Sequence, residues 1–223
     1  MKSIDAVITW VDGSDKEYKK KLEKHLTTST NYKKQYLQAN EIEYCVKSIL
    51  KFAPFIRRIF IVTDNQKPSF SSLENLIASN KVKVVDHKEI FKGYEKYLPT
   101  FNIRSIDAML HRVEGLSETF VYFNDDVFLI NNIREEDWFV KNKGVLMGKW
   151  AKSYSISPLK VLSGKFKKIF GLRPSFNASQ SKAANLSGFK KEYFKSYHTA
   201  RPQIKSLIKE FYHKNPESLI DQI

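Results

Sequence analysis

The amino-acid sequence predicts an α/β protein with a mostly parallel sheet flanked by helices. Four short segments rich in β-branched and aromatic residues each stop at a polar cluster, as buried strands do before a turn. Segments with helical periodicity separate them, and strands that alternate with helices form parallel sheets with right-handed crossovers. At 223 residues, of which 42% are hydrophobic, the chain is long enough to bury one substantial core.

The four predicted strands cover residues 4–11, 59–62, 82–85 and 119–123. The polar clusters that follow them are Asp12–Asp15, Thr63–Gln66, Asp86–His87 and Asn124–Asp126. In sheets of this class the carboxyl ends of the strands meet at one edge, where ligands bind. We therefore expect one polar rim there, which includes Asp12, Asp15, Asp64, Asn65, Asp125 and Asp126.

Helices are expected at residues 42–53, 101–113 and 202–212. In the first of these, Asn40 is placed as the N-cap with Glu43 as its reciprocal partner, and Pro54 ends the helix. The second follows Pro99. Residues 16–36 are highly charged with weak helical periodicity, and we expect them to cover or flank a site.

The composition changes after Trp150. Residues 149–168 are basic, and residues 176–188 are polar and small. We therefore expect residues 1–150 to form an α/β core that binds the ligand, and residues 151–223 to form a basic, largely helical segment that completes the active site.

The net charge of +14 predicts an anionic partner, such as a nucleotide, an acidic polymer or a membrane face. No nucleic-acid recognition module accompanies this charge, so nucleic acid is not expected. Cys45 is the only cysteine, which excludes an intrachain disulfide and favours a reducing compartment. With no signal-peptide core and no apolar run of the ~18 residues that span a bilayer, we expect a cytoplasmic protein, peripheral at most to the inner membrane face.

The strongest local pattern is Asn124-Asp125-Asp126 at the end of a hydrophobic strand. Paired carboxylates at a rigid strand end concentrate the oxygen ligands that hard divalent cations prefer. A metal bound there could neutralise the phosphates of a nucleotide. The alternative is a solvated turn, which Asn and Asp also favour.

The other strand ends offer ligand groups as well. Asp12, Gly13 and Asp15 could let the backbone approach a ligand and bind its ribose hydroxyls. Donors and acceptors from Thr63, Asp64 and Asn65 suit recognition of a base or sugar. Each of these clusters could equally be an ordinary turn.

Two further residues are candidates for chemistry. His198 lies before a predicted helix and beside a cation, which suits proton transfer, although a lone histidine is more often structural or exposed. Arg104 lies near the start of a predicted helix, where it could grip a diphosphate or could be solvated. Motifs for phosphate loops, dinucleotide binding, zincins and redox cysteine pairs are absent from the sequence.

Taken together, the clusters resemble the conserved blocks of the Stealth family of sugar-phosphate transferases. Residues 4–15 resemble the first block, and residues 40–66, 98–102, 110–117 and 123–126 resemble the second. Residues 198–216 are similar to the third block. The chain ends at Ile223, before the fourth block, and has Asp107 where family patterns show Glu.

The resemblance implies a fold like that of nucleotide-diphospho-sugar transferases (GT-A-like). It also implies transfer of hexose-1-phosphate from a nucleotide diphosphate sugar to a hydroxyl of an oligo- or polysaccharide acceptor. Asp125 and Asp126 would organise Mg²⁺ or Mn²⁺, Asn124 and Asn102 would orient the donor, and His198 would transfer a proton or bind the metal. Asp12 and Asp15 would line the donor pocket.

Two alternatives to sugar-phosphate transfer stay open at this stage. One is a conventional glycosyltransferase that releases a nucleoside diphosphate. The other is a noncatalytic module that binds polysaccharide or nucleotide. Either fits the charge and the polar strand ends.

Overall fold

The computed structural model describes residues 3–25, 39–153, 180–181, 183–185 and 187–220. Two compact units make up the chain: Met1–Val145 with Ala200–Ile223, and Leu146–Thr199. Within the described residues, no helix is both long and apolar enough to cross a membrane. The boundaries of these units differ from the functional division at residue 150, which stays a prediction.

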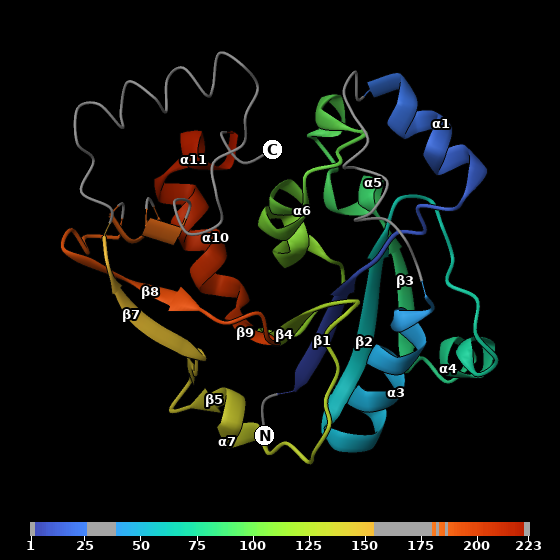
Figure 1. Cartoon of the computed structure of the whole chain (residues 1–223), viewed down its shortest axis with the longest axis horizontal. Helices are drawn as coiled ribbons and strands as arrows, with labels where there is room; N and C mark the ends of the chain where they lie inside the picture. The colour runs from blue at the N-terminus through green and yellow to red at the C-terminus, as the bar shows by residue number, and fades with distance from the viewer. Residues whose placement is uncertain (1–2, 26–38, 154–179, 182, 186, 221–223) are drawn as a thin grey trace. The chain divides into compact units, whose positions relative to one another are not determined.

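The first unit is built on a five-stranded sheet in the order β3-β2-β1-β4-β9 (Figure 1). The strands β1 (Ile4–Thr9), β2 (Ile56–Thr63), β3 (Val82–Asp86) and β4 (Thr119–Asn124) pair in parallel. The last strand, β9 (Arg201–Ile204), pairs antiparallel with β4. The predicted mostly parallel α/β class is confirmed, and all four predicted strands are present.

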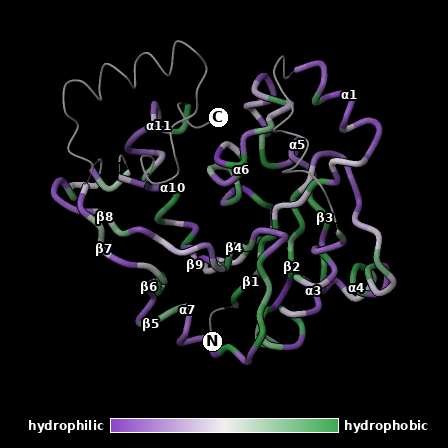
Figure 2. The backbone as a smooth tube through the Cα atoms, in the orientation of Figure 1, coloured by the Kyte–Doolittle hydropathy of each residue, from purple (hydrophilic) through white to green (hydrophobic). Residues whose placement is uncertain are grey.

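Both faces of this sheet are covered, which explains the near-continuous hydrophobic strands. Ala6 and Ile8 of β1 pack on one face with α3 (Glu41–Phe52), α4 (Leu73–Ala78) and α7 (Glu135–Trp138). Val7 points to the other face, where the covering elements are α5 (His87–Ile90), α6 (Ile103–Met109), η2 (Leu110–Arg112), α10 (Lys205–Lys214) and α11 (Pro216–Ile220). The central strands are apolar in Figure 2, whereas α1 (Lys16–His25) is hydrophilic.

Two local predictions were wrong. Pro202 was expected to begin a helix, but it lies in β9 opposite Val121, and the helix begins at Lys205. An edge strand tolerates proline because one side of its backbone needs no partner in the sheet. Asn40 does precede α3, but its backbone is left-handed and its side chain donates to the carboxylate of Glu43 instead of capping a backbone N–H.

Short strands and turns complete the fold. In the first unit β5 (Phe139–Val140) pairs with β6 (Lys143–Gly144), and η1 (Glu95–Tyr97) precedes α6. In the second unit β7 (Gly148–Lys152) pairs antiparallel with β8 (Glu192–Ser196). The basic C-terminal segment, expected to be largely helical, therefore also contributes β8 and β9.

His111 lies in η2, buried between the second face of the sheet and α10. Its Nδ1 donates to the carbonyl oxygen of Ala108 at 2.9 Å, and its ring packs 5.9 Å from that of Tyr212 between centroids. Burial, and then the positive charges of Arg112, Lys209 and Lys205, lower the pKa of His111 from 6.5 to about 4. The folded protein therefore favours the neutral imidazole.

The pKa of His111 is lower in the folded protein than in the unfolded chain, so the neutral histidine contributes stability above pH 6.5. This contribution is lost as the pH falls from 6.5 toward 4. When the pH falls from about 7.5 to about 4.5, we expect the free energy of unfolding to drop by about 2.5 kcal/mol more in the wild type than in His111→Gln. Urea unfolding at both pH values measures this difference. Equal losses in the two proteins would contradict the assignment.

Candidate functional site

The site is defined by the carboxyl ends of the four parallel strands. Strand register places Thr9 beside Asn124, and Thr9 also pairs with Val62 on its other side. Thr63 pairs with Asp86 in the same way. The polar clusters that follow these strands therefore lie along one edge of the sheet, as the sequence predicted.

The turn after β1 is fixed to the turn after β2. The backbone N–H of Asp12 donates to the side-chain oxygen of Gln66 at 2.8 Å, and the amide of Gln66 donates to the carbonyl of Asp12 at 2.9 Å. Gly13 lies within this turn, and Asp15 ends it by accepting from the backbone of Tyr18 at 2.7 Å. Asp15 therefore caps α1.

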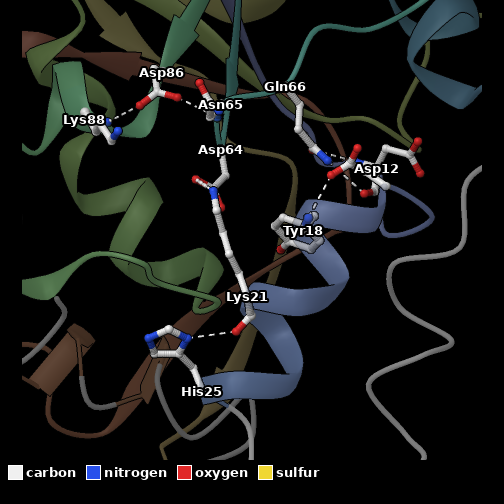
Figure 3. A network of polar contacts seen from close by, with 10 residues as sticks. Asp12, Tyr18, Lys21, His25, Asp64, Asn65, Gln66, Asp86 and Lys88 are labelled. Carbon is white, nitrogen blue, oxygen red and sulfur yellow. Dashed lines mark hydrogen bonds and ion pairs between the residues drawn. The ribbon is translucent and has the colours of Figure 1, made fainter.

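Helix α1 is also attached to the end of β2 by an ion pair. Lys21 Nζ lies 3.0 Å from a carboxylate oxygen of Asp64 (Figure 3). The side chain of Asp64 is only 13% exposed, so this pair is better shielded from water than a surface pair. Residues 16–36 were expected to flank the site, and residues 16–25 form the charged helix α1. Residues 26–36 lie outside the part of the chain that the structure describes.

The end of β3 contributes Asp86 and His87, the polar cluster expected after this strand. Asp86 accepts from the backbone N–H of Asn65 at 2.5 Å and from that of Lys88 at 2.8 Å. His87 is buried beside Asp64 and Asp86, and burial lowers its pKa despite those carboxylates. The sequence shows that Asp86 and His87 follow a strand. It does not show that Asp86 lies beside Thr63 on the neighbouring strand.

The end of β4 presents Asn124, Asp125 and Asp126 within a tight turn. The carbonyl of Asn124 accepts from the backbone of Val127 at 3.1 Å. It also faces the Sγ of Cys45 on α3, at 3.9 Å. Burial raises the pKa of the Cys45 thiol, and the negative charges of Asp125 and Asp126 raise it further. The two carboxylates therefore lie near α3, while both remain partly accessible to solvent.

Asn102 and Arg104 lie at the start of α6. Asn102 is the N-cap, and its side-chain oxygen accepts from the backbone N–H of Arg104 at 3.3 Å. The ring of Phe101, just before the cap, packs 5.7 Å from that of Tyr18 on α1. The start of α6 is therefore held against the helix that follows the first strand.

A buried polar network beside the β4 end was not predicted. Tyr122 and Thr9 share a hydrogen bond of 2.9 Å between hydroxyls on neighbouring strands. The guanidinium of Arg201 lies 4.5 Å from the centre of the Tyr122 ring and 3.5 Å from a carboxylate oxygen of Asp107. Burial raises the pKa of Asp107, against the opposing effect of Arg201.

Thr63 lies on this edge beside Asp86, whereas His198 belongs to the other unit of the chain. Thr63 ends β2 with a buried hydroxyl that has no hydrogen-bond partner among the described residues. His198 is an exposed residue of the second unit, whereas Asp125 and Asp126 belong to the first. A shared role for His198 and these carboxylates stays a prediction.

The metal prediction can be tested against the residues of the edge. The described residues contain no group of three or more His, Cys, Asp or Glu that could hold a metal. Asp125 and Asp126 can therefore supply two carboxylates at most. This number suits Mg²⁺, which keeps several water ligands and binds through one or two carboxylates and the phosphates of a substrate.

The fold and the polar edge define an α/β protein with acidic and amide groups gathered at the carboxyl ends of parallel strands. Residues 2–28 match the description "Stealth protein CR1, conserved region 1", and residues 35–147 match "Stealth protein CR2, conserved region 2". The chain belongs to the Stealth family. The resemblance of residues 198–216 to a third block stays a prediction.

Two relatives illustrate this membership. A capsular polysaccharide phosphotransferase, fcs1, of Haemophilus influenzae is 41% identical over 145 residues, which are 62% of this chain and 38% of the relative. A receptor polysaccharide phosphotransferase, WefC, of Streptococcus oralis is 38% identical over 145 residues, which are 62% of this chain and 42% of the relative. The chain spans about two-fifths of the length of these relatives.

Among solved structures, mouse xyloside xylosyltransferase 1 in its apo form superposes with a TM-score of 0.40 and 13% identity, covering 93% of this chain and 68% of that chain. GalNAc-T7 with UDP, GalNAc and Mn²⁺ superposes with a TM-score of 0.34 and 11% identity, covering 56% of this chain and 18% of that chain.

Proposed function

We propose that this protein transfers hexose-1-phosphate from a nucleotide diphosphate sugar to a hydroxyl of a capsular or exopolysaccharide. The acceptor hydroxyl gives up its proton, its oxygen bonds to the β-phosphorus, the bond from that phosphorus to the bridging oxygen breaks, and a nucleoside monophosphate leaves with that bond's electrons. The product is a phosphodiester. The observation that carries the proposal is the polar edge at Asn124–Asp126, in a chain whose relatives are named polysaccharide phosphotransferases.

The residues of the edge suit the requirements of phosphoryl transfer, which are positioning and neutralisation of charge. Asp125 and Asp126 would hold a divalent cation, Mg²⁺ or Mn²⁺, which supplies positive charge to the phosphates when bound. Asn124 and Asn102 would orient donor oxygens. Because the Asp12–Gln66 hydrogen bonds fix the first two turns to each other, that part of the pocket is held in place before the donor arrives.

The remaining candidates have roles that follow from their positions. Asp12, Gly13 and Asp15 would line the donor pocket, and Asp64 and Asn65 would contact the base or sugar beside Thr63. Arg104, at the first turn of α6, would attract the diphosphate. A cytoplasmic location, supported by the single cysteine of the sequence, belongs to the same proposal.

The identity of the nucleotide product tests this function. We expect release of a nucleoside monophosphate, in the presence of Mg²⁺ and an acceptor, when the protein is given a panel of nucleotide sugars. Chromatography of the nucleotides resolves the product. Release of a diphosphate would identify a glycosyltransferase that attacks the anomeric carbon instead. Donor binding without any turnover would indicate a noncatalytic module.

A further inference from the structure

Arg201 on β9 carries a guanidinium that has no role in the transfer described above. It lies directly opposite Tyr122 of β4 in the sheet register, so the two side chains lie on the same face of the sheet. The guanidinium lies 4.5 Å from the centre of the Tyr122 ring. An aromatic ring in this position holds the guanidinium in one plane and leaves the N–H groups at its edge able to bind a ligand.

The Tyr122 ring places this guanidinium close to the carboxyl edge of the sheet. Tyr122 pairs with Val7 in the register, but its hydroxyl bonds that of Thr9, two residues nearer the edge, at 2.9 Å. Thr9 is the register partner of Asn124. The ring therefore leans toward the strand ends, and the guanidinium of Arg201 lies over it, near the level at which β4 ends.

The ion pair of Arg201 is loose compared with the structural pair in the same sheet. Arg57 donates two hydrogen bonds to the fully buried carboxylate of Asp5, at 2.9 and 2.6 Å. Arg201 makes a single contact of 3.5 Å with Asp107, and both side chains are more than a quarter exposed, at 28% and 27%. Charge-assisted hydrogen bonds between such groups usually measure about 2.7–2.9 Å. Within the described part of the chain, most of the donor capacity of Arg201 is therefore not used.

Two cationic side chains lie near this one carboxylate. Arg104 precedes Asp107 by three residues on α6, so the two side chains lie on the same side of that helix. Burial raises the pKa of Asp107, and the positive charges of Arg201 and Arg104 oppose this effect. The three side chains together carry a net positive charge, which favours an anion at this end of the sheet.

We propose that Arg201 binds a phosphate of the nucleotide diphosphate sugar, with its guanidinium held flat by the Tyr122 ring and oriented by Asp107. The inference rests on the proposed function, because that reaction brings a diphosphate to the end of β4. Two N–H groups of one guanidinium can bind two oxygens of one phosphate. The charge of Arg201 adds to that of a cation at Asp125 and Asp126 and neutralises part of the charge that the leaving monophosphate gains.

The alternative is a structural role, in which Arg201 only compensates the charge of Asp107 and joins β9 to α6. The two roles differ in what happens when Asp107 loses its charge. A structural arginine is no longer needed once the carboxylate is neutral. An arginine that binds phosphate is needed whether or not the carboxylate is charged.

Calorimetric titration with pyrophosphate in the presence of Mg²⁺ measures the phosphate contact without turnover. We expect Arg201→Gln to raise the Kd roughly 10- to 100-fold, because a hydrogen bond between charged groups is lost. Arg201→Lys keeps the charge but not the paired N–H groups, so its Kd should lie between those of the wild type and Arg201→Gln. The control is Arg58→Gln, near the amino end of β2, which should leave the Kd within about twofold.

A double variant separates the two roles. Adding Asp107→Asn to Arg201→Gln leaves two neutral amides, and the Kd should stay as weak as in Arg201→Gln alone. Tight binding in the double variant would show that Arg201 only offsets Asp107, and would overturn the inference. A wild type that does not bind pyrophosphate, or an unchanged Kd in Arg201→Gln, would also overturn it. Arg201→Lys keeps a positive charge beside Asp107 and tests the contact even if Arg201→Gln does not fold.

Competition identifies the source of the phosphate. A nucleotide sugar should displace the bound pyrophosphate, whereas phosphomannan, which carries phosphodiesters as a growing chain does, should not. Displacement by phosphomannan alone would assign Arg201 to the acceptor and contradict the inference. If the Arg201 variants lose pyrophosphate but the wild type releases a nucleoside diphosphate, the proposed sugar-phosphate transfer is refuted and the phosphate contact stands. Release of a monophosphate with an unchanged Kd in Arg201→Gln refutes only the contact.

Discussion

Replacing either carboxylate at the end of β4 is expected to abolish most of the transfer activity. Asp125→Asn and Asp126→Asn should each lower kcat by roughly 100- to 1000-fold, and the double variant by more. The reason is that each change removes a negative oxygen from the only pair of adjacent acidic residues at this strand end. Nucleotide release with saturating donor and Mg²⁺ measures the effect.

Loss of the folded structure would not explain such a result. Neutralising either of two adjacent carboxylates relieves their mutual repulsion, so the Tm should not fall. Donor binding in calorimetry should lose its dependence on Mg²⁺ in the double variant. The control is Glu136→Gln, which removes the same charge from an exposed position on α7 and should leave kcat within about twofold. If the Asp125 and Asp126 variants retain full turnover, the carboxylates form only a turn.

The sheet could be predicted from the sequence because each strand carries its own signal. Residues 4–11, 59–62, 82–85 and 119–123 are short, largely apolar runs, and each is followed by residues that favour turns. Their parallel pairing follows from the helices between them. The same logic places the strand-end clusters on one edge of the sheet.

Features that depend on distant partners could not be predicted in this way. β9 contains Pro202 and reads locally as the start of a helix; only its pairing with β4, about 80 residues earlier, makes it a strand. β7 and β8 are similarly separated along the chain. Nothing local in either segment indicates its partner.

The candidate site shows the same limit. The residue types at each strand end were evident, but the hydrogen bonds between Asp12 and Gln66 join positions 54 residues apart. The contact of Asp107 with Arg201 joins positions 94 residues apart. Charged residues such as these read locally as solvated surface, and only the fold shows that they are partners.

Asp5 is the clearest instance of a polar residue hidden in a hydrophobic strand. It is fully buried in β1, and Arg57 donates two hydrogen bonds to its carboxylate, at 2.9 and 2.6 Å. The backbone N–H of Ser117 donates a third at 2.7 Å. These contacts tie β1 to β2 and to the segment before β4. A buried carboxylate requires such compensation, because its desolvation is costly.

Removing the cation should therefore destabilise the fold strongly. We expect Arg57→Met to lower the free energy of unfolding by about 2–3 kcal/mol, since it leaves Asp5 with the Ser117 bond but without its paired charge. Arg58→Met is the matched control. The guanidinium of Arg58 donates to the carbonyl of Asn80, at 3.2 Å, and lies 5.8 Å from the centre of the Phe60 ring, with no carboxylate bonded to it among the described residues, so we expect a loss below about 1 kcal/mol.

Urea unfolding at neutral pH measures both variants, and a double variant identifies the cause. Adding Asp5→Asn to Arg57→Met removes the unpaired buried charge and should restore part of the lost stability, whereas adding it to the wild type should be destabilising. If the two arginine variants lose the same stability, or if the double variant is less stable than Arg57→Met alone, the ion pair is not what holds β1 and β2 together at this end of the sheet.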